Sequence, residues 1–263
     1  MAEKDLQVST RDYVTVLTIN RPHKHNALTY ELLRTLQGTL EGLADDQGTR
    51  VVVLRGAGER SFSSGMDLNS ILEDVKGSRP ASPLDHELIH KTMQALEMYP
   101  NPVIAMINGD ALAGGCELAL HGDFRLMADT ARIGMPIVKR GLMVPFPLIR
   151  KLVRVVGPFA AAEILIRGAP LNAARAREMG LVNQVLPQAR LEAETMALAN
   201  ELVANAPLTL RALKEGIRKA SLLEADRYSE DMRALLVRVM TSEDAREGLQ
   251  AFLEKRPPKY KGR

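Results

Sequence analysis

The chain has 263 residues, a length that suits one large domain or one domain with a helical appendage. Its single cysteine excludes an internal disulfide and a cysteine-rich metal site, so we expect no metal. A net charge of +3 is compatible with an anionic ligand, whereas 4% aromatic residues and no tryptophan argue against nucleic-acid binding.

No apolar run approaches the roughly 18 residues that a membrane span needs, and no signal peptide precedes the first predicted strand. We therefore expect a cytoplasmic protein without membrane contact. The first half of the chain then alternates strands and helices. In chain order the patterns predict a strand over 14–19, a helix with Thr29 as N-cap running through Leu43, a buried strand over 51–54, a polar loop over 73–83 and a helix over about 84–98.

The next elements flank a glycine pair. The predictions are a strand over 103–107, a turn over 108–110, a short helix that opens at Gly114 and a strand over 124–127. From about residue 146 the pattern is mostly helical. The expected elements are a strand-like stretch over 181–186, a helix from Pro207, two helices over about 224–240 and 242–254, and a basic tail over 255–263. Leucine and isoleucine side chains give the helix from Pro207 an apolar face that needs a partner.

The glycine pair at 114–115 is the first candidate site. Backbone N–H groups at a helix start have no intrahelical partner and can bind a developing negative charge. Glycine lets a ligand approach that backbone closely, and Glu117 follows about one turn later, within reach for proton transfer. Donors for an oxyanion beside a carboxylate indicate an enolate-forming site, although a glycine pair before a helix can also serve tight packing alone.

A second segment, 61–68, supports the enolate-forming interpretation. It follows the buried strand 51–54, and it is small, hydroxylated and glycine-bearing, so it can present further N–H groups. We expect the two strand-to-loop units to face one another across a pocket.

With both segments in hand, the chain resembles the crotonase (enoyl-CoA hydratase/isomerase) superfamily over nearly its whole length. Five motifs in the family's order carry the resemblance: NRPHKHNAL at 20–28, FSSGMDL at 62–68, ING at 107–109 with GGCEL at 114–118, GLVNQV at 180–185 and FLEKR at 252–256. The resemblance implies an α/β fold, a spiral of strand–strand–helix turns over 1–200 that holds a CoA-thioester site. It further implies a C-terminal helical region for trimerisation over 201–263, and a homotrimer or a hexamer built as a dimer of trimers.

The resemblance also implies roles for individual residues. The thioester oxygen would lie between the N–H groups of Met66 and Gly114, and Glu117 would position and deprotonate the water that adds to the β-carbon. The CoA is part of the substrate, and no separate cofactor is expected. The residues expected at the substrate and its CoA moiety are Lys24, His25, Ser64, Gly65, Asp67, Leu68, Ile137 and Lys255. Asp67 also fits a role in structuring its loop, and the lysines also fit a solvated surface.

One residue departs from the family's pattern. Ile137 occupies the position of the second hydratase glutamate, and isoleucine carries no proton. His90, which lies four residues after His86 on the predicted helix 84–98, is a possible substitute donor because histidine titrates near neutrality. Both histidines equally fit an ordinary surface position.

Three functions remain open on this sequence. The first is an enoyl-CoA hydratase-type lyase that acts through enolate stabilisation, with Glu117 as its recognised acid/base. The second is an acyl-CoA isomerase or decarboxylase, which needs one proton-transfer group. The third is an acyl-CoA-binding protein with little catalytic activity, for which Glu117 has no obvious use.

Overall fold

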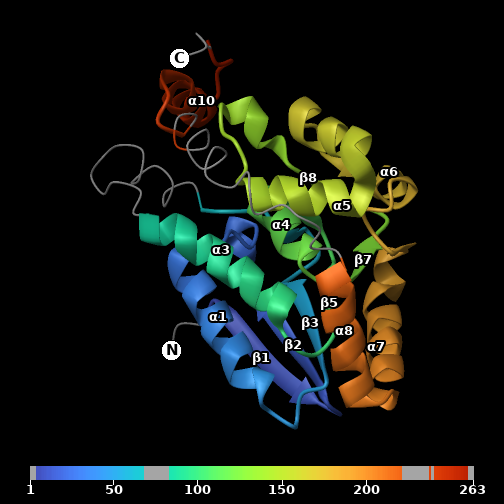
Figure 1. Cartoon of the computed structure of the whole chain (residues 1–263). Helices are drawn as coiled ribbons and strands as arrows, with labels where there is room; N and C mark the ends of the chain where they lie inside the picture. Colours follow the sequence, from blue (N-terminus) through green and yellow to red (C-terminus); the bar gives the residue numbers. More distant parts are fainter. Residues whose placement is uncertain (1–3, 68–82, 221–236, 238–239, 260–263) are drawn as a thin grey trace.

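Two sheets form the centre of the molecule in a computed structural model that describes residues 4–67, 83–220, 237 and 240–259 (Figure 1). The larger sheet has the order β1(Leu6–Arg11), β2(Val14–Ile19), β3(Val51–Gly56), β5(Val103–Ile107), β7(Phe124–Ala128) and β10(Gln184–Leu186). The smaller sheet has the order β4(Ser61–Ser63), β6(Asp110–Leu112), β8(Arg132–Gly134) and β9(Leu171–Asn172). Only the β1–β2 and β8–β9 pairs are antiparallel among these strands.

Each turn of the chain contributes one strand to each sheet. The pairs β3 and β4, β5 and β6, and β7 and β8 repeat this step, and each new strand lies parallel to its counterpart from the previous turn. An isolated parallel bridge joins Leu28, from the loop after β2, to Met66, from the segment after β4. The predicted α/β spiral of strand–strand–helix turns is therefore confirmed. The division at residue 200 and the trimerisation role of the C-terminal region stay predictions.

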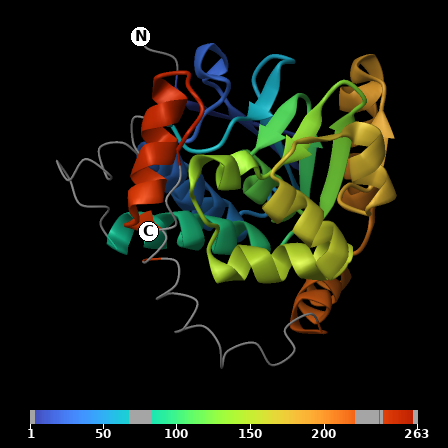
Figure 2. The same ribbon diagram turned by 90° about the horizontal axis from the view of Figure 1, so that it is seen from above.

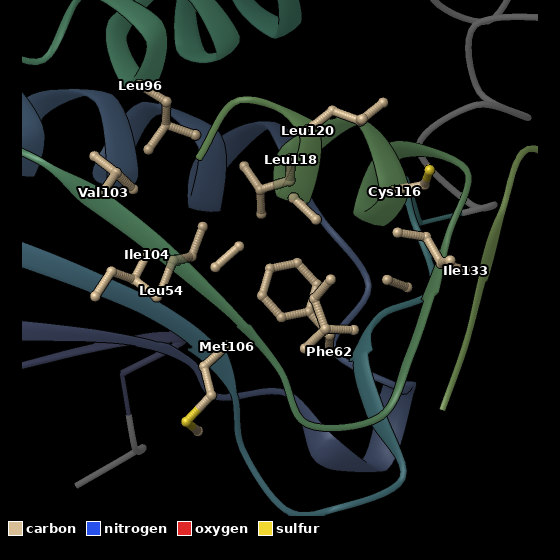
Figure 3. Close-up of a cluster of buried hydrophobic side chains, with 14 of the residues drawn as sticks. Leu54, Phe62, Leu96, Val103, Ile104, Met106, Cys116, Leu118, Leu120 and Ile133 are labelled. Carbon is tan, nitrogen blue, oxygen red and sulfur yellow. The ribbon is translucent and has the colours of Figure 1, made fainter. Parts of the chain in front are cut away.

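The strands of the larger sheet form because β-branched runs suit a sheet that is covered on both faces. Every residue of β5 is buried, and so are the first four residues of β3. Phe62 of β4 lies in the middle of the core between the sheets, surrounded by Leu54, Ile104 and Leu118 (Figure 3). Phe62 thus anchors β4 in the core, immediately before the segment that follows this strand.

Helices cover both faces of this arrangement. The helices are α1(Tyr30–Ala44), α3(Pro83–Met98), α4(Gly114–Leu120), α5(Phe146–Ala162), α6(Ala173–Glu178), α7(Gln188–Ala204), α8(Pro207–Ala220) and α10(Glu243–Leu253), with short helical segments η1(Pro22–Lys24), η2(Pro136–Arg140) and η3(Glu163–Arg167). α1 and α3 pack side by side, while α7 packs on β3, β5 and β7 (Figure 1). α10 packs on η2, at the side of the molecule away from α7 and α8 (Figure 2).

The predicted helices agree with the structure where it describes them. The Thr29 hydroxyl accepts a hydrogen bond from the Leu32 N–H at 3.1 Å and caps α1 as predicted. Of the expected loop over 73–83, residues 73–82 lie outside the described residues and Pro83 begins α3, and most of the expected helix over 224–240 also lies outside them.

Three strand predictions were wrong in detail. Residues 61–63, expected as part of a loop, form β4, and Asp110, expected at the end of a turn, begins β6; both strands are too short for the pattern of alternation to appear. The strand-like stretch over 181–186 is reduced to β10, because the Leu181 N–H donates back to the Ala176 carbonyl of α6 at 2.9 Å and the chain extends only after this bond.

α8 docks on the core through its polar face. Lys214 donates to the Asp123 carboxylate at 2.7 Å and to the Asn101 carbonyl at 3.0 Å, and Arg211 donates to the Asn101 side chain at 2.8 Å. The apolar residues of the helix are left outside: Leu208, Leu213 and Ile217 are 80%, 58% and 72% exposed. An exposed apolar face of this kind is typical of an interaction site, and the partner expected from the sequence stays a prediction.

Candidate active site

The segment after β4 is held in place by Leu28. The Leu28 N–H donates to the Gly65 carbonyl at 2.8 Å, and the Asp67 N–H donates to the Leu28 carbonyl at 2.8 Å. Met66 therefore lies between two peptide groups that are both fixed to the same residue. Gly65 has φ +94°, a conformation that glycine adopts without strain.

The predicted CoA-side loop packs onto this segment. The His25 carbonyl accepts hydrogen bonds from the Ser61 hydroxyl at 2.9 Å and from the Ser64 N–H at 3.0 Å. The Lys24 and His25 side chains are exposed, and Ser64 is half-buried. The structure thus brings the residues of the first and second sequence motifs together at one edge of the sheets.

The start of α4 lies against the same segment. A Cβ atom built on Gly115 would lie 2.1 Å from the Ser63 carbonyl oxygen, so only glycine fits there. A Cβ on Gly65 would lie 2.8 Å from the Gly114 nitrogen. Ala113, the residue before the helix, has φ +50° and is held by an N–H bond to the Gly134 carbonyl at 2.9 Å. The glycines are needed because two backbone segments approach each other closely.

This approach brings the two predicted amides side by side. A Cβ atom built on Gly114 would lie 3.4 Å from the Met66 nitrogen. Within the part of the chain that the structure describes, neither the Met66 N–H nor the Gly114 N–H donates to a protein acceptor, and both residues are only half-buried. Two unpaired donors in this arrangement can bind one oxygen atom.

Glu117 supplies a carboxyl group one helical turn from Gly114. Burial raises the pKa of the Glu117 carboxyl to about 7. Its carboxyl makes no hydrogen bond or ion pair with the described residues. A carboxylate that merely stabilised a helix N-terminus would show the opposite shift, because the helix dipole favours the charged form. Near neutral pH this group populates both protonation states and can accept or donate a proton.

Comparison with known proteins identifies the family. The family model described as enoyl-CoA hydratase/isomerase matches residues 9–263. The chain belongs to this family, within the crotonase superfamily. The 2,3-dehydroadipyl-CoA hydratase of Escherichia coli K12 is 33% identical over 264 residues, which cover 98% of this chain and 99% of that protein.

Solved structures of crotonase-superfamily proteins match the whole fold. A methylmalonyl-CoA decarboxylase in complex with 2-nitronate-propionyl-CoA aligns with a TM-score of 0.90 and 29% identity over 100% of both chains. An enoyl-CoA hydratase from Bacillus anthracis aligns with a TM-score of 0.78 and 33% identity, covering 99% of this chain and 100% of that one. The chain is therefore similar to members with different reactions.

In this crotonase-superfamily chain, Ile137 lies on η2 after β8. Its side chain is half-buried and packs against the core. α10 closes over the same segment, since a Cβ atom on Gly248 would lie 2.0 Å from the Arg140 carbonyl oxygen. The Arg140 guanidinium stacks on the Phe252 ring at 4.3 Å. The short helical segment η2, which contains Ile137, is thus backed by α10.

The other predicted site residues are more dispersed. Lys255 is exposed just after α10, and His90 is exposed on α3. Leu68 lies outside the described residues, as does the side chain of His86. His90 forms no hydrogen bond or ion pair with Glu117, so its role as a second proton donor stays a prediction.

Two further titratable groups of α4 are structural in character. His121 is buried, its Nδ1 lies 2.8 Å from the Glu117 carbonyl, and burial lowers its pKa to about 4. Burial raises the pKa of the Cys116 thiol to about 12. Both shifts keep these groups neutral near neutral pH.

The described residues form neither a metal-binding cluster nor a membrane-spanning helix. Nowhere in the described ranges do three histidine, cysteine or acidic side chains gather as they would around a metal ion. None of the described helices is long and apolar enough to cross a membrane.

Sequence reasoning missed Arg21. This residue belongs to the first motif, but its type alone gave no reason to connect it with the segment after β4, 46 residues away. Its guanidinium reaches the Asp67 carboxylate at 3.3 Å. Asp67 therefore has the structuring contact that its sequence context allowed.

The close approach of Gly115 to Ser63 can be tested by substitution. We expect Gly115→Ala to abolish activity and to lower the free energy of unfolding by about 1–3 kcal/mol or more, because the added methyl group must push the two segments apart. Gly42→Ala is the matched control. It lies in α1 with nothing near its Cβ position and should be neutral or stabilising by up to about 1 kcal/mol. Denaturant unfolding measures both, and an active, equally stable Gly115→Ala variant would contradict the geometry.

The raised pKa of the Glu117 carboxyl predicts that the free energy of unfolding depends on pH. Between its ordinary value of 4.5 and about 7 the folded chain holds this proton while the unfolded chain has released it, so stability falls as pH rises through this window. We expect Glu117→Gln to be more stable than the parent at about pH 8, on the order of 1–3 kcal/mol, with a smaller difference at about pH 5. Unfolding at both pH values measures this. Glu201→Gln, on an exposed position of α7, should show no such trend.

Proposed function

We propose that this chain is an acyl-CoA enzyme that binds a thioester oxygen between the N–H groups of Met66 and Gly114. The observation that carries the proposal is the pair of unpaired amides side by side at the meeting point of two glycine-bearing segments. Such donors bind an enolate oxygen more strongly than a neutral carbonyl, and each is worth about 3–4 kcal/mol in comparable oxyanion holes. Their contribution comes from the backbone and does not depend on the Met66 side chain.

Glu117 is the proton-transfer group in this proposal. Its pKa of about 7 suits both proton acceptance and proton donation near neutral pH. A protein that only bound acyl-CoA would have no use for a half-buried carboxyl group without a partner. This favours an enzyme over a binding protein.

Hydration of an enoyl-CoA is the first candidate reaction. Glu117 takes a proton from water, the water oxygen bonds to the β-carbon, and the electrons of the double bond move to the thioester oxygen as an enolate. Ile137 supplies no proton, so Glu117 returns the proton it took to the α-carbon. The names of hydratase relatives at 33% identity support this candidate.

Decarboxylation is the second candidate, favoured by the single acid. The bond between the α-carbon and a carboxylate breaks, carbon dioxide leaves, and its electron pair forms the enolate. Protonated Glu117 then donates to the α-carbon, so only one proton transfer is required. The TM-score of 0.90 with a methylmalonyl-CoA decarboxylase supports this candidate.

Isomerisation is the alternative within the same class. An isomerase that moves a double bond would use the same single acid, Glu117.

The same geometry supports a proposed path for the CoA moiety. Ser64 and Gly65 would line its path, and the exposed Lys24 and His25 would meet its phosphates, because they lie on the loop that packs against Ser64. Lys255 would contribute from the end of α10.

We also propose that the chain forms a homotrimer, alone or paired into a hexamer. The support comes from α8, whose polar face is engaged with Asp123 and Asn101 while its apolar face is exposed. A second copy of the chain is the partner that a self-associating family would offer.

The candidate reactions can be separated by substrate. The parent enzyme is assayed for hydration of crotonyl-CoA, isomerisation of a 3-enoyl-CoA and release of carbon dioxide from methylmalonyl-CoA. We expect activity on one of them, and Glu117→Gln should lower kcat by about 10²–10⁴-fold because proton transfer is lost. Glu201→Gln serves as the control. Unchanged turnover in Glu117→Gln would remove this residue from the mechanism.

The oligomer can be tested at α8. We expect Ile217→Glu to shift the protein to a smaller species in light scattering at micromolar concentration, because a charge would have to be buried in the interface. Glu201→Gln should keep the parent's mass. If the parent itself is monomeric at that concentration, the trimer proposal fails.

A further inference from the structure

Arg21 holds a central position beside the segment after β4. Its side chain is only 13% exposed. The guanidinium donates to the Ala27 carbonyl at 2.7 Å and, through both terminal nitrogens, to the Asp67 carboxylate at 3.3 Å. Its Nε lies 3.2 Å from the Asp5 carboxylate. One cation therefore connects three separate segments of the chain.

These contacts bracket Met66. Ala27 precedes Leu28, the residue that pairs with the peptides on either side of Met66, and Asp67 follows Met66 directly. The backbone bonds at Leu28 set the distance between the two segments. The Arg21 guanidinium also links Ala27, the neighbour of Leu28, with Asp67, the neighbour of Met66. This link restrains rotation of the peptide group that carries the Met66 N–H.

Because the ion pair between Arg21 and Asp67 is largely buried, substitution of either residue should disturb the local structure. Asp67 is 14% exposed and Arg21 is 13% exposed, so removing one partner takes away a charge-assisted contact between two largely buried groups. Lysine cannot replace arginine here, because the planar fork contacts a carbonyl and a carboxylate at once. The position of the Arg21 and Asp67 side chains is therefore coupled to the backbone on either side of Met66.

We propose that Arg21 and Asp67 are positioning residues for the Met66 N–H. Their ion pair fixes the direction of that donor before a ligand binds. The inference rests on the proposed role of this amide as a donor to a thioester oxygen. It assigns to Asp67 a function through the backbone rather than through contact with CoA.

The test compares two probes that differ in charge at the thioester. Propionyl-CoA carries a neutral carbonyl, whereas 2-nitronate-propionyl-CoA is an anionic analogue of an enolate. Calorimetry measures both dissociation constants for the parent, Arg21→Lys, Asp67→Asn and the double variant. We expect each variant to keep propionyl-CoA affinity within about twofold and to lose about tenfold for the nitronate, near 1.4 kcal/mol. The double variant should lose little more than either single variant, because one pair is removed.

A control and two adverse outcomes complete the design. Arg175→Lys, which alters the 2.8 Å ion pair between Arg175 of α6 and Glu163 of η3, should bind both probes like the parent. If the parent prefers the nitronate and the variants keep that preference, the positioning role is wrong while the proposed function stands. If the parent shows no preference, the donor role of Met66 fails, and the positioning role fails with it. Conservative Arg21→Lys keeps the charge, so it separates loss of the fork from loss of folding, which circular dichroism checks.

Discussion

The contact between the start of α4 and the segment after β4 is the constraint on which the site depends. Gly115 has no space for a side chain beside the Ser63 carbonyl, and Gly65 has none beside the Gly114 nitrogen. This closeness places two amides at one point and leaves them without protein acceptors in the described chain. Because both proposed donors are backbone groups, their side chains are free to vary, and the reaction must be decided by the few side chains nearby.

The spiral explains why these segments meet. Each turn crosses from the larger sheet to the smaller one, so successive crossings stack along the same edge. The loop containing His25, the segment after β4 and the start of α4 come from consecutive crossings. Glu117 then lies one helical turn into the core, where loss of solvent raises its pKa. Position in the fold, rather than a charged neighbour, makes this carboxyl group useful near neutral pH.

Local patterns predicted the parts of the chain whose chemistry is local. Gly114, Glu117 and the cap at Thr29 could be recognised because glycine pairs, helix starts and capping residues are defined by near neighbours. The ion pair between Arg21 and Asp67 could not, because it spans 46 residues and depends on how two loops stack. The inward polar face of α8 was missed for the same reason: amphipathic spacing gives a helix two faces but does not say which one meets the sheet.

Ala113 has a backbone conformation that residues other than glycine rarely adopt, and this strain lowers the stability of the fold by on the order of 1–3 kcal/mol. The bond to the Gly134 carbonyl and the burial of α4 hold it there. The cost is met once, when the chain folds, and not again in each catalytic cycle. In the proposed reaction the Gly114 amide would therefore already be set when a substrate arrives, with no reorganisation of the loop left for binding to drive.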